Sequence, residues 1–210
     1  MSKRKSISYS QFSQWDKCPY MWKLNYVDRL SVFTDNIHTL FGTSMHEVLQ
    51  EYLKVMYTQS IKEADQLYLD EQLEDRLKKN FLEIVKKNGG DEFCTKDQMV
   101  EFYEDGLKIL DYFKKKRNMY FSKRGYELVG IETALDYGLP KNIKFRGYID
   151  LIIKDTVRNR IKIIDIKTST MGWNKYQKAD KNKTDQLLLY KQFYSKQHDV
   201  PMDRIEVEYF

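Results

Sequence analysis

The fold is decided by KFRGYIDLIIKDTVRNRIKIIDIK, residues 144–167, in which two apolar runs are joined by a polar connection. β-branched and aromatic residues are frequent in Lys144–Lys154 and in Arg160–Lys167, so both segments are predicted to be strands. Because the connection between them is short and polar, we expect the two strands to form an antiparallel hairpin.

The two predicted strands carry charged residues on which a metal site could be built. Asp165 and Lys167 are two residues apart, so they would share one face of their strand. The hairpin can also place Asp150 beside Asp165. Neighbouring carboxylates repel each other and raise each other's pKa unless a cation lies between them. Carboxylate oxygens suit Mg²⁺ or Mn²⁺, so this pattern indicates a divalent metal site.

Residues 43–118 are expected to be largely helical. Ser44-Met-His-Glu47 has the spacing of a capping box, which would start a helix here and put His46 in its first turn. Apolar residues at helical spacing predict a second helix over residues 61–88 and a third over residues 96–117.

The remaining segments complete an α/β chain. Further strands are expected over Glu127–Asp136 and Ile205–Phe210, and a helix over Thr184–Gln197. The segment Ser8–Pro19 is expected to be a helix that begins with capping hydroxyl residues and ends at its proline. The aromatic-rich stretch that follows, Tyr20–Tyr26, is interpreted as core packing.

Composition excludes several classes of protein. The 210 residues are 41% hydrophobic and 14% aromatic, which argues against disorder because such a chain can bury enough apolar surface to fold. A net charge of +5 favours an anionic partner, while no apolar run is long enough for a membrane span or a signal peptide. Cys18 and Cys94 form no disulfide framework, so a reducing, cytoplasmic setting is expected. The basic start, Met1–Ser6, is either a frayed terminus or an arm that contacts phosphates.

Five elements, in this order, resemble the RecB-like branch of the PD-(D/E)XK nuclease superfamily. They are Ser8–Tyr20 with its Cys-Pro pair, Gly42-Thr-Ser-Met-His46, Gly147-Tyr-Ile-Asp150, Asp165-Ile-Lys167 and Gln186-Leu-Leu-Leu-Tyr190. Each element alone is weak, but together they cover residues 8–190 and form a specific pattern. The resemblance implies a restriction-endonuclease-like α/β fold, with a mixed β-sheet core flanked by helices and a largely helical elaboration.

The same resemblance suggests how the chain is organised. Residues 1–42 would supply the N-terminal helix and aromatic segment of the nuclease core. Residues 43–120 would form the helical elaboration that carries the histidine, and residues 121–210 the catalytic core. We expect these three parts to make one structural domain overall.

The resemblance also implies a set of metal ligands. Asp150, Asp165 and the main-chain carbonyl of Ile166 would bind Mg²⁺ or Mn²⁺, and His46 would be a further ligand. Some members of this branch hold an iron–sulfur cluster through four cysteines, of which Cys18 would be the first. Residues 191–210 contain no cysteine, and Cys94 does not match the pattern, so no cluster is expected in this chain.

Catalytic roles follow from the same comparison of motifs. Lys167 would hold the attacking water or help to deprotonate it, and would offset the charge that develops on the phosphorane. Gln186 and Tyr190 lie at i and i+4, so both can reach one site from one helix face and orient Lys167 or a phosphate. Glu132 would either support the site from the preceding strand or be a solvated charge.

The loop after the second predicted strand mixes aromatic residues with lysines. These residues are Trp173, Lys175, Tyr176, Lys178, Lys181 and Lys183. Lysines bind phosphates and aromatic rings stack on bases, so the loop suits a partly single-stranded nucleic acid. A solvated lysine-rich loop is the alternative interpretation.

The sequence therefore predicts a metal-dependent DNA nuclease. Its substrate would be single-stranded DNA or duplex ends, and it would act as an exonuclease or end-processing enzyme in recombination, repair or replication, with a helicase or recombination protein as a possible partner. Two alternatives stay open: a non-catalytic nucleic-acid-binding or scaffolding module, and a nuclease for RNA or RNA–DNA hybrids. The complete set of Asp150, Asp165 and Lys167 argues against the non-catalytic module.

Overall fold

The computed structural model describes residues 5–30, 34–168 and 181–210, and these form two compact units. Unit 1 contains residues 5–30, 125–165 and 181–210, and unit 2 contains residues 34–124 and 166–168. The expectation of one structural domain overall stays a prediction. None of the helices among the described residues combines the length and hydropathy needed to cross a bilayer.

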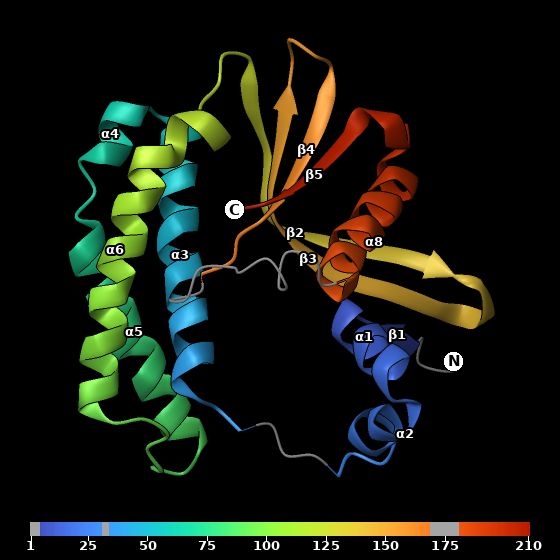
Figure 1. Cartoon of the computed structure of the whole chain (residues 1–210), viewed down its shortest axis with the longest axis horizontal. Coiled ribbons are helices and arrows are strands. Elements are labelled where there is room, and N and C mark those ends of the chain that lie inside the picture. The colour runs from blue at the N-terminus through green and yellow to red at the C-terminus, as the bar shows by residue number, and fades with distance from the viewer. Residues whose placement is uncertain (1–4, 31–33, 169–180) are drawn as a thin grey trace. The chain divides into compact units, whose positions relative to one another are not determined.

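Unit 1 is built on a mixed five-stranded sheet (Figure 1). Its strands are β1 (Lys5–Ile7), β2 (Tyr126–Leu139), β3 (Ile143–Asp155), β4 (Arg160–Asp165) and β5 (Ile205–Tyr209). β3 pairs with β2 and β4 in antiparallel fashion and with β1 in parallel fashion, and β5 adds to β4 in parallel. The sheet confirms the predicted antiparallel hairpin and the predicted mixed α/β architecture.

Helices of unit 1 lie before and after these strands. They are α1 (Tyr9–Lys17), α2 (Pro19–Trp22), the π-helical turn η1 (Lys23–Val27) and α8 (Lys181–His198), with 3-10 turns η2 (Pro140–Asn142) and η3 (Met202–Arg204). The long helix α8 buries Tyr190, Phe193 and Tyr194 against the sheet, where the Phe193 ring stacks on Phe145 with centroids 4.3 Å apart. This apolar layer fixes α8 on the sheet and positions the polar residues of its first turns.

Two strand boundaries differ from the sequence-based expectation. β4 ends at Asp165, so the prediction that Asp165 and Lys167 share a strand face is wrong. Asp165 is the last residue of β4 with a partner in β5, where it pairs with Tyr209, and Ile166 and Lys167 follow outside the strand. β1 was not expected, since three residues are too short to show alternation, and it forms by pairing with β3. The frayed-terminus interpretation is therefore wrong for Lys5 and Ser6.

The start of the chain also departs from the expectation at Pro19. Ser8 caps α1 as expected, with its hydroxyl accepting a hydrogen bond from the Gln11 amide at 3.3 Å. α1 ends at Lys17, and Pro19 begins α2 instead of ending a helix, with Cys18 as the N-cap residue. Proline is favourable at the first position of a helix because its missing N–H has no intrahelical partner there.

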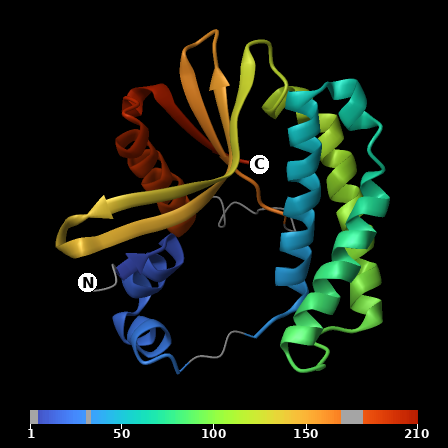
Figure 2. The same cartoon turned by 180° about the vertical axis from the view of Figure 1, so that it is seen from behind.

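Unit 2 is helical, as predicted for residues 43–118 (Figure 2). Its helices are α3 (Ile37–Thr58), α4 (Ile61–Asp65), α5 (Leu69–Lys87) and α6 (Lys96–Tyr120). The predicted second helix is thus broken between α4 and α5. α6 approaches α3 and α5 closely at Gly106, where an added Cβ would lie 2.4 Å from the Leu73 side chain.

The predicted capping box at Ser44 is wrong. α3 begins seven residues earlier, where Asn36 and Thr39 form the capping box. Ser44 lies inside the helix, fully buried, and its hydroxyl donates to the Leu40 carbonyl at 2.9 Å. The apolar face of α3 already begins at Ile37, so packing extends the helix past the local signal at Ser44. His46 consequently lies in the third turn.

Arg117, in the basic last turn of α6, makes contacts within unit 2. Arg117 forms an ion pair with Asp65, and both residues hydrogen bond to the Tyr52 hydroxyl. Burial of Tyr52, together with its hydrogen bond to Asp65, raises the pKa of this tyrosine to about 12. Arg117 therefore has its partners inside unit 2.

Candidate metal and nuclease site

A local irregularity in β2 and β3 creates the site. The ladder pairs Ile131 with Leu151 and Thr133 with Ile149, so Glu132 lies opposite Asp150. Glu132 has a φ of 48°, in the left-handed region that non-glycine residues rarely adopt. Strained backbone of this kind is concentrated at functional sites.

The alternation of side chains along β3 is also interrupted next to Asp150. Phe145, Ile149 and Ile152 all contribute to the core beneath α8, although strict alternation would send Ile152 to the other face. The alternation therefore shifts by one residue between Ile149 and Ile152, next to Asp150. Both strands bend sharply along this part of the hairpin (Figures 1 and 2). Asp150 and Glu132 therefore lie where the regular geometry of the two strands is interrupted.

The register of β3 and β4 brings the second predicted aspartate to the same place. The last pair in the ladder is Leu151 with Ile164, so Asp150 and Asp165 are the next residues on their two strands. Residues that lie directly opposite in an antiparallel pair project from the same face. Asp165 is buried, with 4% of its surface exposed. The register of these neighbouring pairs agrees with the predicted placement of Asp150 beside Asp165, which stays a prediction.

Three carboxylates consequently come from three adjacent strands. A carboxylate oxygen of Glu132 lies within 4.8 Å of one of Asp150. Like charges at this separation repel, and a cation between them removes the repulsion. The donor set of hard oxygens suits a divalent ion such as Mg²⁺ or Mn²⁺. Glu132, interpreted from the sequence as either a supporting residue or a solvated charge, is therefore part of a possible ligand group.

Helix α8 contributes two polar side chains to the same site. The Gln186 amide nitrogen donates to Asp165 Oδ1 at 3.1 Å and lies 3.3 Å from the Tyr190 hydroxyl. Burial raises the pKa of Tyr190, and the negative charges of Asp165, Asp150 and Glu132 raise it further. The sequence-based prediction that Gln186 and Tyr190 reach one site is consistent with these contacts.

Gly147 is required by the position of Tyr190. An added Cβ at Gly147 would lie 3.0 Å from a ring carbon of Tyr190 and 3.2 Å from its hydroxyl oxygen. Contacts this short force the ring to move, because a rigid aromatic side chain cannot bend away. The glycine of the Gly147–Asp150 motif therefore makes room for a site residue on α8.

We expect Gly147→Ala to lower the nuclease activity that the motif resemblance implies by about ten-fold and to destabilise the fold by about 1–3 kcal/mol, because the displaced Tyr190 strains the core beneath α8. Gly138→Ala is the matched control. Gly138 lies on β2, which pairs with β3, and a Cβ added there meets nothing within 4 Å. Cleavage rates and urea unfolding midpoints of the two variants test this expectation. Equal behaviour of both variants would contradict the assigned role of Gly147.

Three predicted site residues belong to unit 2. His46 lies on α3 and is half-buried, Ile166 is buried, and Lys167 is exposed directly after β4. The predicted nucleic-acid contacts Trp173, Lys175, Tyr176 and Lys178 lie outside the described residues, as do the side chains of Lys181 and Lys183. The roles of all these residues stay predictions.

A sheet of this topology, with carboxylates converging from neighbouring strands, defines a restriction-endonuclease-like α/β fold. A family model described as the PD-(D/E)XK nuclease superfamily matches residues 6–210. The chain therefore belongs to the PD-(D/E)XK nuclease superfamily. Among curated proteins, none shows a significant sequence match. The family match and the carboxylate group agree with a metal-binding nuclease site.

Proposed function

We propose that this chain is a divalent-metal-dependent nuclease of the RecB-like branch that hydrolyses phosphodiester bonds in DNA. The observation that carries the proposal is the pair of Glu132 and Asp150, whose carboxylate oxygens lie within 4.8 Å of each other, together with buried Asp165 on the next strand, which accepts a hydrogen bond from Gln186. Asp165 is 4% exposed, and burying a carboxylate costs free energy unless a hydrogen-bond partner or a cation offsets its charge.

The proposed ligands are those that the motif resemblance implies, with Glu132 added. Asp150, Asp165 and Glu132 would supply carboxylate oxygens, Ile166 a main-chain carbonyl oxygen, and His46 an imidazole nitrogen. Oxygen-rich sets suit Mg²⁺ and Mn²⁺, and a nitrogen ligand favours Mn²⁺ more than Mg²⁺. The ion would supply Lewis-acid polarisation of a phosphate oxygen.

Lys167, Gln186 and Tyr190 would orient the attacking water, the ligand Asp165 and the phosphate. Lys167 would orient the attacking water and balance negative charge as the oxygen–phosphorus bond forms and the bond to the leaving oxygen breaks. The water proton would pass to a neighbouring base or to solvent, and the leaving oxygen would receive a proton. Gln186 holds Asp165 in place, and Tyr190, whose pKa burial raises further above its usual range, keeps its hydroxyl proton and can donate a hydrogen bond to a phosphate oxygen.

The proposal extends to substrate and process. We propose DNA with single-stranded or duplex ends as substrate, and exonuclease or end-processing action in repair, recombination or replication. A helicase or a recombination protein would deliver such ends. These assignments rest on the motif resemblance and on the net charge of +5, which favours a polyanionic substrate.

A panel of end-labelled DNA tests the proposed function. Single-stranded, duplex and closed circular DNA are incubated with the full chain in Mg²⁺, in Mn²⁺ and in EDTA. We expect degradation of linear DNA with either metal and none in EDTA, and survival of the circles would identify an exonuclease. Binding without cleavage in either metal would favour the non-catalytic module instead, and cleavage restricted to RNA or hybrid strands would favour the RNA nuclease.

A further inference from the structure

The first helices of unit 1 expose a group of aromatic rings. We define the aromatic surface as Phe12, Trp15, Tyr20 and Tyr26, which are contributed by α1, α2 and η1. None of these three elements contains a buried residue. The interpretation of the stretch from Tyr20 to Tyr26 as core packing is therefore wrong, because these rings find no core to enter among the described residues.

The exposure is concentrated in one short part of the chain. Among the described residues, eighteen large hydrophobic side chains are exposed, and seven of them lie between Phe12 and Leu30. Tyr20 keeps 69% of its surface exposed and Trp15 keeps 48%. Single exposed hydrophobic residues are ordinary, but a concentration of them marks an interaction surface.

Basic residues accompany the rings. Residues 5–30 contain Lys5, Lys17, Lys23 and Arg29 against Asp16 and Asp28, which gives a net charge of +2. Lys23 is paired with Asp28 at 2.9 Å. Lys17 is exposed in the last turn of α1, two residues from Trp15. Aromatic rings interleaved with positive charge match a ligand that offers both flat bases and phosphates.

The aromatic surface lies in the same unit as the three carboxylates. α1 packs against α8, the helix that carries Gln186 and Tyr190 (Figure 1). A nucleic-acid strand that reaches the carboxylates along α8 would therefore pass the rings of α1. In a duplex the bases are stacked inside and cannot contact such rings, whereas a single strand can offer its bases.

We propose that the aromatic surface stacks the bases of a single-stranded nucleic acid whose phosphodiester backbone leads to the carboxylate site. The proposal rests on the proposed function and names the form of its substrate. Every base has a flat π face, so this contact would not select a sequence. The surface would favour frayed or unwound ends over blunt duplex.

Binding in EDTA tests the proposal, because no metal-dependent cleavage then occurs. The affinities of fluorescein-labelled single-stranded dT20 and of a blunt 20-base-pair duplex are measured by anisotropy for the wild type, Trp15→Ala and Tyr20→Ala. We expect each alanine variant to bind the single strand about five-fold or more weakly, because one stacked base is lost, and to bind the duplex as the wild type does. Trp15→Phe and Tyr20→Phe keep a ring and are expected to restore most of the affinity.

Salt dependence separates stacking from charge. Trp15→Ala removes no charge, so the slope of log affinity against log salt is expected to stay at its wild-type value. Lys17→Ala is expected to reduce the magnitude of that slope by about 0.7 if it contacts a phosphate of a single strand.

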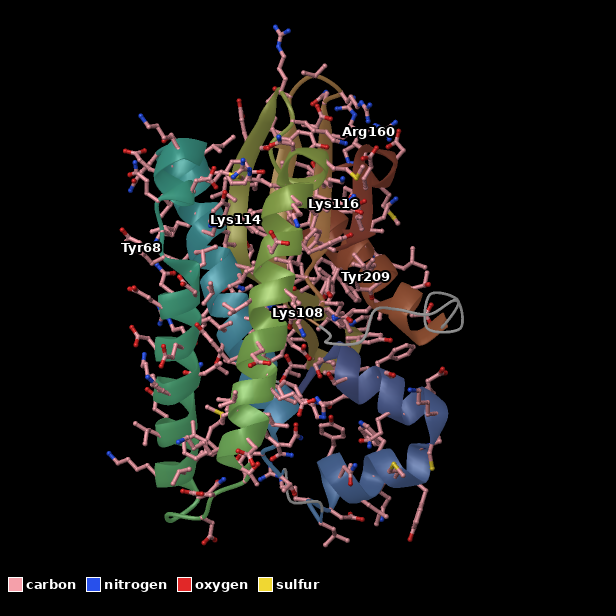
Figure 3. The ribbon with its side chains drawn as sticks, turned by 60° about the vertical axis from the view of Figure 1, so that its left-hand side comes forward. Tyr68, Lys108, Lys114, Lys116, Arg160 and Tyr209 are labelled. Carbon is pink, nitrogen blue, oxygen red and sulfur yellow. The ribbon has the colours of Figure 1, made fainter. Side chains whose placement is uncertain are left out.

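Tyr68→Ala is the matched control. Tyr68 is 71% exposed, like Tyr20, but it precedes α5 in unit 2 (Figure 3). We expect this variant to bind both DNA forms as the wild type does. Wild-type affinity of Trp15→Ala and Tyr20→Ala for the single strand would overturn the proposal, and so would an equal loss for single strand and duplex.

Sedimentation tests whether the aromatic surface is a self-association interface instead. Cleavage assays test the proposed nuclease function separately from the binding proposal. If Trp15→Ala dissociates an oligomer but keeps its affinity for the single strand, the surface is a self-association interface and the proposal fails. If the wild type binds the single strand through these rings yet cleaves nothing with metal, the proposed nuclease function fails while the binding proposal stands.

Discussion

Asp165→Asn is expected to lower metal-dependent DNA cleavage by about 1,000-fold or more while the protein remains folded. The substitution preserves the volume of a buried side chain, and the Asn oxygen can still accept the hydrogen bond from Gln186. It removes the negative charge that would bind the proposed divalent ion at this position. An interaction worth several kcal/mol in the transition state corresponds to a loss of this size.

Single-turnover cleavage of labelled DNA in Mn²⁺, together with thermal unfolding, measures the two consequences of Asp165→Asn separately. Asp155→Asn is the matched control, since Asp155 is also a buried aspartate of the same hairpin, and its Oδ1 accepts hydrogen bonds from the amides of Val157 and Arg158. The control is expected to cleave at the wild-type rate. Cleavage by Asp165→Asn within ten-fold of wild type would remove Asp165 from the proposed ligand set.

Lys167→Ala is the second change with a large expected effect. We expect cleavage to fall by about 100-fold or more while the affinity for DNA changes only a few-fold, because the proposed task of Lys167 lies in the transition state. A group that acts only in the transition state lowers the rate without weakening ground-state binding. Anisotropy in EDTA and single-turnover rates in Mg²⁺ give the two numbers.

Lys154→Ala controls for the loss of one positive charge. Lys154 is exposed on β3 of the same hairpin, so its removal changes the net charge by the same amount. We expect this variant to keep the wild-type rate. If Lys167→Ala instead loses affinity and rate in equal proportion, Lys167 is a phosphate-binding residue and has no special part in the chemistry.

Much of unit 1 could be predicted because its signals are local. The hairpin from Ile143 to Asp165 was predictable, since β-branched runs and a polar turn occur within one short stretch. The register of that hairpin then follows from the turn, and with it the predicted placement of Asp150 beside Asp165. The contact between Gln186 and Asp165 was expected only through the motif resemblance, because nothing in the sequence alone positions α8 on β4.

Other features depended on partners that are distant in sequence. The capping signal at Ser44 was overridden because the apolar face of α3 begins earlier and is buried within unit 2. β4 ends at Asp165, the last residue that pairs with β5, although the local sequence Ile164-Asp-Ile166 continues the apolar pattern of a strand. Glu132 gave no clear signal, because its φ of 48° and its place opposite Asp150 depend on the pairing of β2 with β3.

The sequence by itself determined the mixed α/β class, the hairpin and the identity of its acidic residues, because strand alternation and a tight turn are set by neighbouring residues. Only the tertiary structure decided that Glu132 joins Asp150, that Gly147 makes room for Tyr190, and that the rings of Trp15 and Tyr20 remain exposed. Each of these depends on which surfaces meet when the chain packs, and burial is a property of the whole fold that local sequence does not specify.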